Sequence, residues 1–249
     1  MDLGLKGRRA LVTAASKGLG RACAETLVAE GAAVFISSRD LKSIEAAALE
    51  IGAAGSSARD LSKAEDPEAL VNEAVDRLGA LDILVVNAGG PPPGVFETVP
   101  LDAWERAFDL TLMSAVRLVH AALPHLKRSD QGRLVFITSI SVRQPIANLL
   151  LSNSLRAAVT GLAKSLSLEL AADRITVNCL APDAILTDRL RHLAGSEENL
   201  RRMAERAPMK RFGEPAEFAA ACAFLCSRQA AYISGQTLGV DGGSLLGVH

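Results

Sequence analysis

The first residues with chemical potential form a glycine-containing turn near the start of the chain. The segment Thr13-Ala-Ala-Ser-Lys-Gly-Leu-Gly20 follows an apolar run and opens a helix-length segment. Glycines at such a turn let backbone N–H groups approach a pyrophosphate at the positive end of a helix. With a strand before it and a helix after it, the turn predicts a dinucleotide site, and a ligand-free tight turn is the alternative. The residues expected to contact the cofactor here are Ser16, Lys17, Gly18, Leu19 and Gly20.

A charged pair at the end of the next expected strand bears on the choice of cofactor. This strand ends in Ser38-Arg39-Asp40. An acid at this place would bind the ribose 2′-OH of NAD, whereas an arginine would bind the 2′-phosphate of NADP. Because Lys17 adds a second cation, the pattern favours NADP, and we expect NADPH to bind more tightly than NADH. The alternative is that Arg39 is solvated and Asp40 only caps the following helix.

Composition narrows the class of partner. The 249 residues include 27 basic and 28 acidic side chains, and aromatic residues make up 4%. Such a chain lacks the basic surface and stacking platforms that nucleic-acid binding needs, and no apolar run reaches the length of a membrane span. The four cysteines and four histidines show no metal-ligand spacing, so no metal is expected. The start of the chain has no apolar signal segment, so we expect a cytoplasmic protein with a small-molecule substrate.

Short strands alternate with helices along the whole chain. Several strands are apolar at almost every position, which is typical of strands buried on both faces of a parallel sheet. The alternation predicts an α/β fold, a Rossmann-type doubly wound parallel sheet in three layers, as a single domain over residues 1–249. The expected strands are 9–13, 33–37, 57–59, 83–87, 134–138, 175–180 and 237–240, and the helices start near Gly18, Leu41, Pro67, Leu101, Leu149 and Pro215.

Several further motifs follow one another along the chain in a specific order and spacing. They are Ala14-x-x-x-Gly18-x-Gly20, Asp60-Leu61, Asn87-Ala88-Gly89, Ser139, Val177-Asn178, Pro182, Thr187 and the tail 240–243. Their order resembles that of the short-chain dehydrogenases/reductases, and most nearly the 3-oxoacyl-acyl-carrier-protein reductase type. The resemblance implies that Asp60, with Leu61, holds the adenine edge. It also implies that Asn87, Ala88 and Gly89 line the cofactor groove and that Pro182 and Thr187 lie beside the nicotinamide.

The catalytic positions of this family depart from its pattern. The family uses Asn, Ser, Tyr and Lys, and the spacing from Ser139 puts Ser152 at the tyrosine position and Arg156 at the lysine position. Thr111 stands at the asparagine position. A phenol can be tuned toward neutral pH by a nearby cation, whereas an aliphatic hydroxyl is a far weaker acid. Arginine stays protonated, so Arg156 can bind ribose and polarise an oxygen without relaying a proton.

Two functions follow from an intact cofactor groove beside an altered catalytic set. The leading hypothesis is an NADP(H)-dependent oxidoreductase for a carbonyl or alcohol, in which Ser139 orients the substrate oxygen, Arg156 polarises it and water supplies the proton. The rival is a non-catalytic nucleotide-binding homologue that serves as a sensor or an assembly subunit. Tyr232, the only tyrosine, and Asp183, which replaces a family glycine, are weaker candidates for an altered site chemistry.

Two further expectations concern the surroundings of the site. The segment 188–208 is expected to form the substrate lid. Likeness to the family implies a homotetramer, and apolar residues beyond the needs of one sheet face agree with this, among them Leu112-Met113 and Leu149-Leu150-Leu151.

Overall fold

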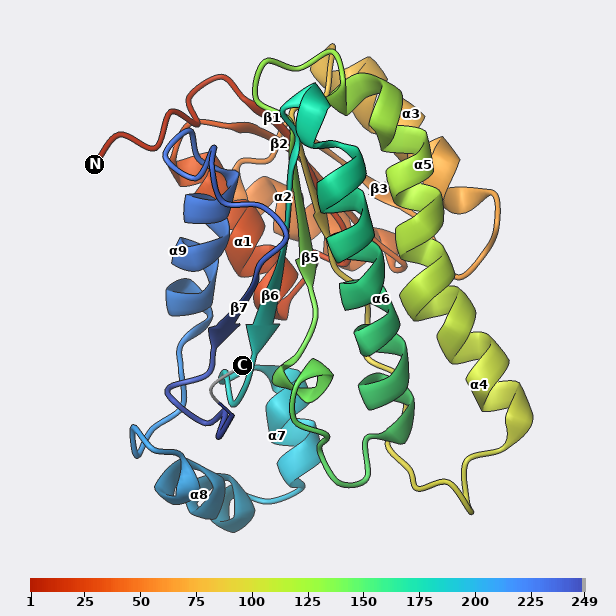
Figure 1. Ribbon diagram of the computed structural model, residues 1–249, viewed down its shortest axis with the longest axis vertical. Helices are drawn as coiled ribbons and strands as arrows, with labels where there is room; N and C mark the ends of the chain where they lie inside the picture. The colour runs from red at the N-terminus through yellow and green to blue at the C-terminus, as the bar shows by residue number, and fades with distance from the viewer. Residues whose placement is uncertain (248–249) are drawn as a thin grey trace.

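Seven parallel strands form the central layer of the computed structural model, which describes residues 1–247 (Figure 1). Their order across the sheet is β3-β2-β1-β4-β5-β6-β7. The order therefore reverses between β1 and β4, and a ligand crevice forms outside the carboxyl ends of the strands at such a point. The strands are β1 (Arg9–Val12), β2 (Ala33–Ser38), β3 (Gly55–Ala58), β4 (Ile83–Val86), β5 (Arg133–Ile137), β6 (Thr176–Pro182) and β7 (Thr237–Val240).

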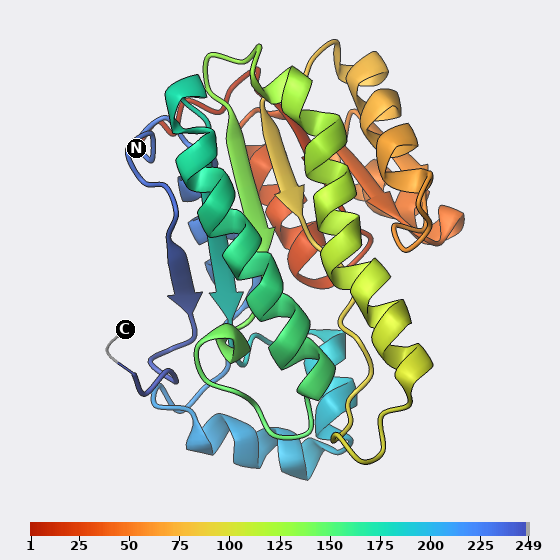
Figure 2. The same cartoon turned by 45° about the vertical axis from the view of Figure 1, so that its right-hand side comes forward.

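Helices cover both faces of the sheet, as Figures 1 and 2 show. One face packs against α1 (Gly18–Ala29), α2 (Leu41–Ile51) and α9 (Pro215–Cys226), and the other against α3 (Asp66–Leu78), α5 (Ser114–Leu126) and α6 (Leu150–Glu169). Strands β4 and β5 are buried at every position, which explains their apolar sequence. The three-layer fold expected from the sequence is confirmed.

Three of the four cysteines lie inside the packing between α1 and α9. Cys222 and Cys226 of α9 are fully buried together with Cys23 of α1. They act as small apolar side chains between the two helices.

The long helix expected from Leu101 is interrupted by one wider turn. Helix α4 (Leu101–Phe108) passes into a π turn (Asp109–Met113) and then into α5. Thr111 lies in the middle of this turn and is buried. Single π turns inside helices occur frequently at functional sites. The helical periodicity of the sequence did not predict it.

Two short helices occupy the segment between β6 and α9. They are α7 (Asp188–Ala194) and α8 (Glu197–Arg206), and both lie at the carboxyl edge of the sheet (Figure 1). The Thr187 hydroxyl accepts a hydrogen bond from Leu190 N, and the Ser196 hydroxyl accepts one from Asn199 N, so each helix begins at a side-chain cap. The expected lid segment 188–208 therefore has helical structure that the sequence reading did not assign.

One strand begins earlier than expected. The sequence placed β3 at 57–59, whereas it spans Gly55–Ala58 and pairs with β2 from Phe35 onward. A Cβ on Gly55 would lie 2.8 Å from the Phe35 ring, so the glycine allows β3 to pack closely there. Glycine within a strand often marks such a close approach of another group.

No helix in the described part of the chain is both long and apolar enough to cross a membrane.

Candidate cofactor groove and active site

The glycine-containing turn has the backbone that a closely bound ligand requires. Gly18 has a φ of +60°, and the N-cap residue Lys17 is exposed at the start of α1. A Cβ on Gly20 would lie 2.5 Å from Ala14 O and 2.7 Å from Asn87 Nδ2, so only glycine fits there. Ser16 and Leu19 are partly exposed on the same turn. The turn thus leaves backbone N–H groups and one cation free to meet a phosphate.

Ala14, at the first position of the turn motif, has a strained backbone conformation. Its φ is +48°, in the left-handed region that residues with a Cβ rarely adopt. Such a conformation costs about 1–2 kcal/mol. The turn therefore keeps its shape at the expense of local strain.

The two charged residues after β2, Arg39 and Asp40, make different contacts. Asp40 caps α2, because its carboxylate accepts hydrogen bonds from Ser43 N at 2.8 Å and from the Ser43 hydroxyl at 2.5 Å. Those bonds hold the pKa of Asp40 below its ordinary value. Arg39 is exposed and makes no hydrogen bond or ion pair with another side chain in residues 1–247. The capping role weighed for Asp40 is confirmed, and this leaves Arg39 as the group available to an added phosphate.

The expected adenine site lies beside Arg39. Asp60 accepts hydrogen bonds from Ser62 N at 3.2 Å and from the Ser62 hydroxyl at 2.8 Å. Burial raises the pKa of Asp60, but these bonds and the nearby charge of Arg39 outweigh it, so the net pKa lies below the ordinary value. Leu61 is buried next to it. An ionised Asp60 can accept a hydrogen bond from an adenine amino group.

Asn87 joins the two halves of the groove. Its side-chain Nδ2 donates to Ala14 O at 3.1 Å, its backbone N donates to the Thr13 hydroxyl at 2.8 Å, and that hydroxyl donates to Asn87 O at 2.7 Å. These bonds fix the turn after β1 against the end of β4. Ala88 and Gly89 continue from there along the groove, and Gly89 has no neighbour that a Cβ would meet.

The segment after β6 reaches the same turn. Pro182 ends β6 beside Val240, and Thr187 caps α7. A Cβ on Gly18 would lie 3.9 Å from Thr187 Cγ2, so the β6–α7 connection faces the glycine-containing turn. The structure therefore gathers the predicted cofactor-binding residues at one edge of the sheet.

The four predicted catalytic positions lie near the ends of β4 and β5. Ser139 follows β5, and its hydroxyl accepts a hydrogen bond from Ser141 N at 3.1 Å. Ser152 lies one helical turn before Arg156 on α6, and it is buried. Arg156 Nη1 donates to Ile137 O at 2.8 Å and to Thr138 O at 3.0 Å. Arg156 is thereby anchored to the strand that carries Ser139.

A small cavity connects two of these positions. Its volume is about 10 Å³, roughly the space of one water molecule, and Thr111, Arg156 and Ala88 line it together with apolar side chains. The Thr111 hydroxyl is buried and has no hydrogen-bond partner among residues 1–247. Buried polar atoms of this kind are rare, and a bound water is the usual partner. The altered set thus retains a place for one water beside Arg156.

The electrostatics of Arg156 follow from its surroundings. Burial of the guanidinium lowers the pKa of Arg156 to about 10, and the positive charge of Arg189 contributes in the same direction. Arg156 therefore stays protonated at neutral pH, as the sequence predicted. Arg189 itself donates to Gly90 O and Pro91 O, both at 3.3 Å. The sequence reading missed Arg189, since nothing in its local pattern indicated that α7 turns back over β4.

The two weaker candidates for altered chemistry, Tyr232 and Asp183, have surroundings of their own. Tyr232 is fully exposed on the α9–β7 connection, where the adjacent Ile233 O accepts from Asn178 Nδ2. Asp183 lies after β6 but faces the tail of the chain. Burial raises the pKa of Asp183, a hydrogen bond to Ser244 counteracts it, and Asp241 raises it further. The tail beyond β7, and not Ser139 or Arg156, surrounds this carboxylate.

The asparagines near the site turn out to shape a loop. Asn153 accepts from Ile146 N at 3.2 Å and donates to Ile146 O at 2.9 Å, which fixes the loop between Ser139 and α6. Asn148 has a φ of +62°, and its carbonyl accepts from Gly94 N at 2.8 Å. The sequence assigned neither residue a role, because both bonds depend on the path of the loop.

Comparisons with known proteins agree with this architecture. The family model described as enoyl-(acyl carrier protein) reductase matches residues 13–244. The bovine (Bos taurus) dehydrogenase/reductase SDR family member 4 is 37% identical over 246 residues, which cover 97% of this chain and 88% of that protein. The chain belongs to the short-chain dehydrogenase/reductase family.

Two solved structures extend the comparison to bound ligands. L-sorbose reductase from Gluconobacter frateurii, complexed with NADPH and L-sorbose, has a TM-score of 0.94 and 32% identity, and the alignment covers 100% of both chains. A short-chain oxidoreductase from Pseudomonas aeruginosa PAO1, NADPH-bound and described as containing an atypical catalytic center, has a TM-score of 0.88 and 30% identity over 96% of both chains. These neighbours support binding of a nicotinamide dinucleotide by this chain's fold.

Proposed function

We propose that the protein is an NADP(H)-dependent oxidoreductase that interconverts a carbonyl compound and an alcohol through a modified active site. The observation that carries the proposal is the placement of Ser139, Arg156 and the small cavity next to the candidate cofactor groove. A bound NADPH would supply a hydride to the carbonyl carbon. The reported relatives are oxidoreductases by name, which favours this function over a purely nucleotide-sensing one.

In this proposal, each residue of the altered set has one task. The Ser139 hydroxyl orients the substrate oxygen, and the Arg156 guanidinium contacts the nicotinamide ribose and the same oxygen. Preorganised donors of this kind stabilise the negative charge that develops on the oxygen. Neither Ser152 nor Arg156 releases a proton at neutral pH, so a water molecule, with the Thr111 cavity as its site, delivers the proton that completes the alcohol.

The cofactor preference is the second part of the proposal. Exposed Arg39 and Lys17 are available to the 2′-phosphate of NADP, while the Asp40 carboxylate that could hold a 2′-OH is engaged in its helix cap. Charge-assisted hydrogen bonds to a phosphate favour the phosphorylated cofactor. We therefore propose that NADPH binds more tightly than NADH.

The assembly is the third part. We propose a homotetramer, supported by apolar side chains that remain exposed on α4 and α6, such as Leu101 and Leu168. Of the residues that suggested association, Leu151 is fully buried in the protomer and so belongs to its core. Light scattering at micromolar concentration tests the proposal, and a monomeric mass would refute it. The cytoplasmic location stays a prediction from the sequence.

Cofactor binding and turnover test the proposed function separately. Titration of NADPH and NADH, followed by nicotinamide fluorescence, measures the groove alone. Stopped-flow oxidation of bound NADPH by a panel of carbonyl compounds measures the chemistry. Ser139→Ala is expected to leave NADPH binding intact and to slow oxidation about 10-fold or more, since it removes a hydrogen bond to the reacting oxygen.

A further inference from the structure

Two arginines from distant parts of the chain converge on the loop after β4. Arg156 comes from α6 and lines the small cavity together with Ala88. Arg189 comes from α7 and lies against Gly90, where any side chain would collide with its guanidinium. Both guanidinium groups therefore lie against the segment 88–91, and the positive charge of Arg189 contributes to the lowered pKa of Arg156. Arg156 is the residue proposed above to contact the reacting oxygen, and Arg189 contacts the same segment through Gly90 O and Pro91 O.

Neither arginine has a negative partner in the described residues. No carboxylate of residues 1–247 lies within 4.0 Å of either guanidinium, and all of their hydrogen bonds go to backbone carbonyls. Arg156 uses only Nη1 for its bonds, so Nε and Nη2 remain for a ligand. Two like charges held together without a counter-ion are unfavourable, and an anion would relieve this.

The guanidinium groups of Arg156 and Arg189 differ in the lengths of their hydrogen bonds to backbone carbonyls. The Arg156 bonds are 2.8 and 3.0 Å long, whereas both Arg189 bonds are 3.3 Å long. Arg189 is also exposed, so solvent and ligands can reach it. The planar fork of an arginine matches a carboxylate in a bidentate arrangement. Arg189 can therefore exchange two weak carbonyl contacts for two stronger ones to a ligand.

We propose that the substrate is an oxo acid, a carbonyl compound whose own carboxylate is bound by Arg189 while Arg156 faces the carbonyl oxygen. The inference rests on the proposed function and names its substrate class. Reduction adds one hydride to the carbonyl carbon and one proton from water to the oxygen, so that an oxo acid becomes a hydroxy acid. The paired cations also stabilise the oxygen as charge develops, which offsets part of the loss of a tunable acid.

The test compares substrates that differ only in charge. Wild-type protein is offered 2-oxo and 3-oxo acids of four to six carbons and the methyl ester of each. We expect kcat/KM to be about 10- to 100-fold higher for the favoured acid than for its ester, which is the usual worth of a hydrogen-bonded charge. Arg189→Gln should remove this advantage mainly by raising KM for the acid, with a smaller loss for the ester, which has no carboxylate to bind.

A matched variant separates this role from a general effect on the lid. Arg191 lies on the same helix and pairs with Glu197 at 3.6 Å on the exposed side. Arg191→Gln should leave the ratio of acid to ester as in wild type. Arg189→Lys keeps the charge but loses the fork, so it should restore part of the ratio.

NADPH affinity is measured in every variant, so that a failure of the oxo-acid inference can be told apart from a failure of the proposed function. Absence of NADPH binding in wild type would count against the proposed function. An acid-to-ester ratio near one, with NADPH bound, would overturn the oxo-acid inference alone. If Arg189→Gln instead weakened NADPH binding and slowed acid and ester equally, Arg189 would serve a cofactor phosphate, and the inference would also fail.

A second measurement does not need turnover. NADP⁺-loaded protein is titrated with the same acids and esters, and their binding is followed by calorimetry. Tighter binding of an acid than of its ester, lost in Arg189→Gln but not in Arg191→Gln, is the expected result. Equal binding of acids and esters by wild type would contradict the inference even if the protein proved catalytically silent.

Discussion

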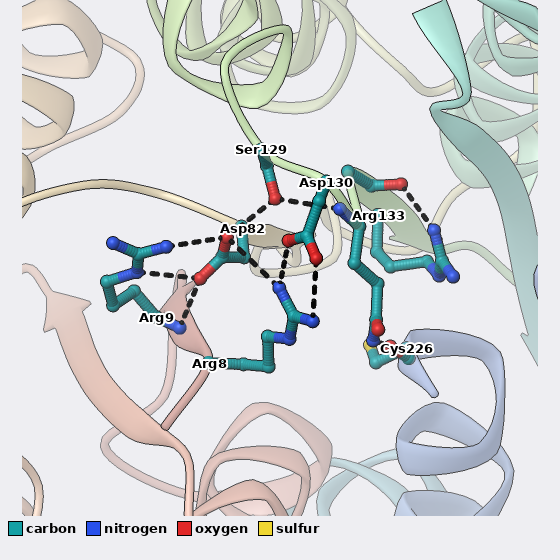
Figure 3. A network of polar contacts seen from close by, with 9 residues as sticks. Arg8, Arg9, Asp82, Ser129, Asp130, Arg133 and Cys226 are labelled. Carbon is teal, nitrogen blue, oxygen red and sulfur yellow. Dashed lines mark hydrogen bonds and ion pairs between the residues drawn. The ribbon is translucent and has the colours of Figure 1, made fainter. Parts of the chain in front are cut away.

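Two arginines at the amino ends of the strands (the amino edge) pair with carboxylates, whereas two at the carboxyl ends (the carboxyl edge) do not. At the amino edge, Arg9 donates to the buried Asp82 carboxylate at 2.7 and 2.9 Å, Arg8 pairs with Asp130, and Ser129 donates to Asp82 at 2.6 Å (Figure 3). At the carboxyl edge, Arg39 and Arg156 have no carboxylate partner in residues 1–247. The arginines of this network are neutralised within the chain, whereas Arg39 and Arg156, which we propose to bind the cofactor and the substrate, have no such partner.

The amino edge also holds one exception that sharpens the contrast. Arg133 is buried, and its guanidinium donates to Ser227 O at 3.1 Å and Gly132 O at 2.9 Å rather than to a carboxylate. Burial lowers its pKa. Arg133 is buried away from solvent, and backbone carbonyls accept its hydrogen bonds. Arg156, in contrast, borders the candidate cofactor groove. An uncompensated arginine thus indicates a ligand site only where a ligand can reach it.

The largest effect is expected from rebuilding the family's acid at the carboxyl edge. The double change Ser152→Tyr with Arg156→Lys supplies a phenol and the amine that tunes it. We expect reduction of a neutral ketone to rise about 10²- to 10⁴-fold over wild type, the usual worth of a general acid. Stopped-flow NADPH oxidation measures the gain.

The single changes are the controls for that experiment. Because the phenol and the amine act as one unit, either change alone should give little. A thermal melt confirms that each variant folds, since Ser152 is buried. Brisk wild-type turnover on neutral ketones that falls in Ser152→Tyr would show that the site uses a different chemistry.

Removing the Asp82 carboxylate at the amino edge should lower the free energy of unfolding without changing NADPH affinity. Asp82→Asn removes the carboxylate that accepts from Arg9. Because both guanidinium groups are partly exposed and Arg8 keeps Asp130, we expect a loss of about 1–3 kcal/mol in the free energy of unfolding. Denaturant titration measures the loss, and NADPH affinity of the folded variant serves as the control. Unchanged stability would contradict the structural role of the network.

The pH dependence of the same network follows from the Asp82 carboxylate. Burial raises the pKa of Asp82, but the bonds from Arg9 and Ser129 outweigh it and hold the net pKa below the ordinary value. Its contribution to stability is therefore present above the unfolded pKa, about 3.9, and is lost as the pH falls through the lower folded pKa. Wild type should lose stability over that acidic range more steeply than Asp82→Asn does.

At the carboxyl edge, Arg39→Ala should weaken NADPH binding about 10- to 100-fold and leave NADH binding nearly unchanged. The reason is the loss of a charge-assisted bond to the 2′-phosphate. Lys42→Ala removes an exposed cation from the following helix and is the matched control. Equal affinities of wild type for the two cofactors would refute the preference.

The smallest effect concerns the turn between the two halves of the groove. Ala14→Gly relieves the left-handed conformation of Ala14, although glycine costs more entropy on folding. We expect a net gain of about 0.5–1 kcal/mol, seen as a rise of roughly 1–4 °C in the melting temperature. A lower melting temperature would show that the turn is not strained.

The sequence predicted the parts of the molecule that depend on local patterns. Buried strands, the helix starts and the glycine-containing turn each have a residue pattern of their own, and Gly20 shows why, since its lack of a side chain is required by two neighbours. The π turn at Thr111 and the approach of Arg189 to Gly90 depend on packing between distant segments. No local pattern encodes such contacts, so the charge arrangement at the site became visible only in three dimensions.

The most direct test of the account is a single turnover. Wild-type protein loaded with one equivalent of NADPH is mixed with the panel of oxo acids and neutral ketones, and absorbance of the reduced nicotinamide is followed. We predict stoichiometric oxidation by at least one oxo acid, slowed in Ser139→Ala and not in Arg191→Gln. Tight NADPH binding without oxidation by any compound of the panel would contradict the assignment as an oxidoreductase and favour a nucleotide-binding role.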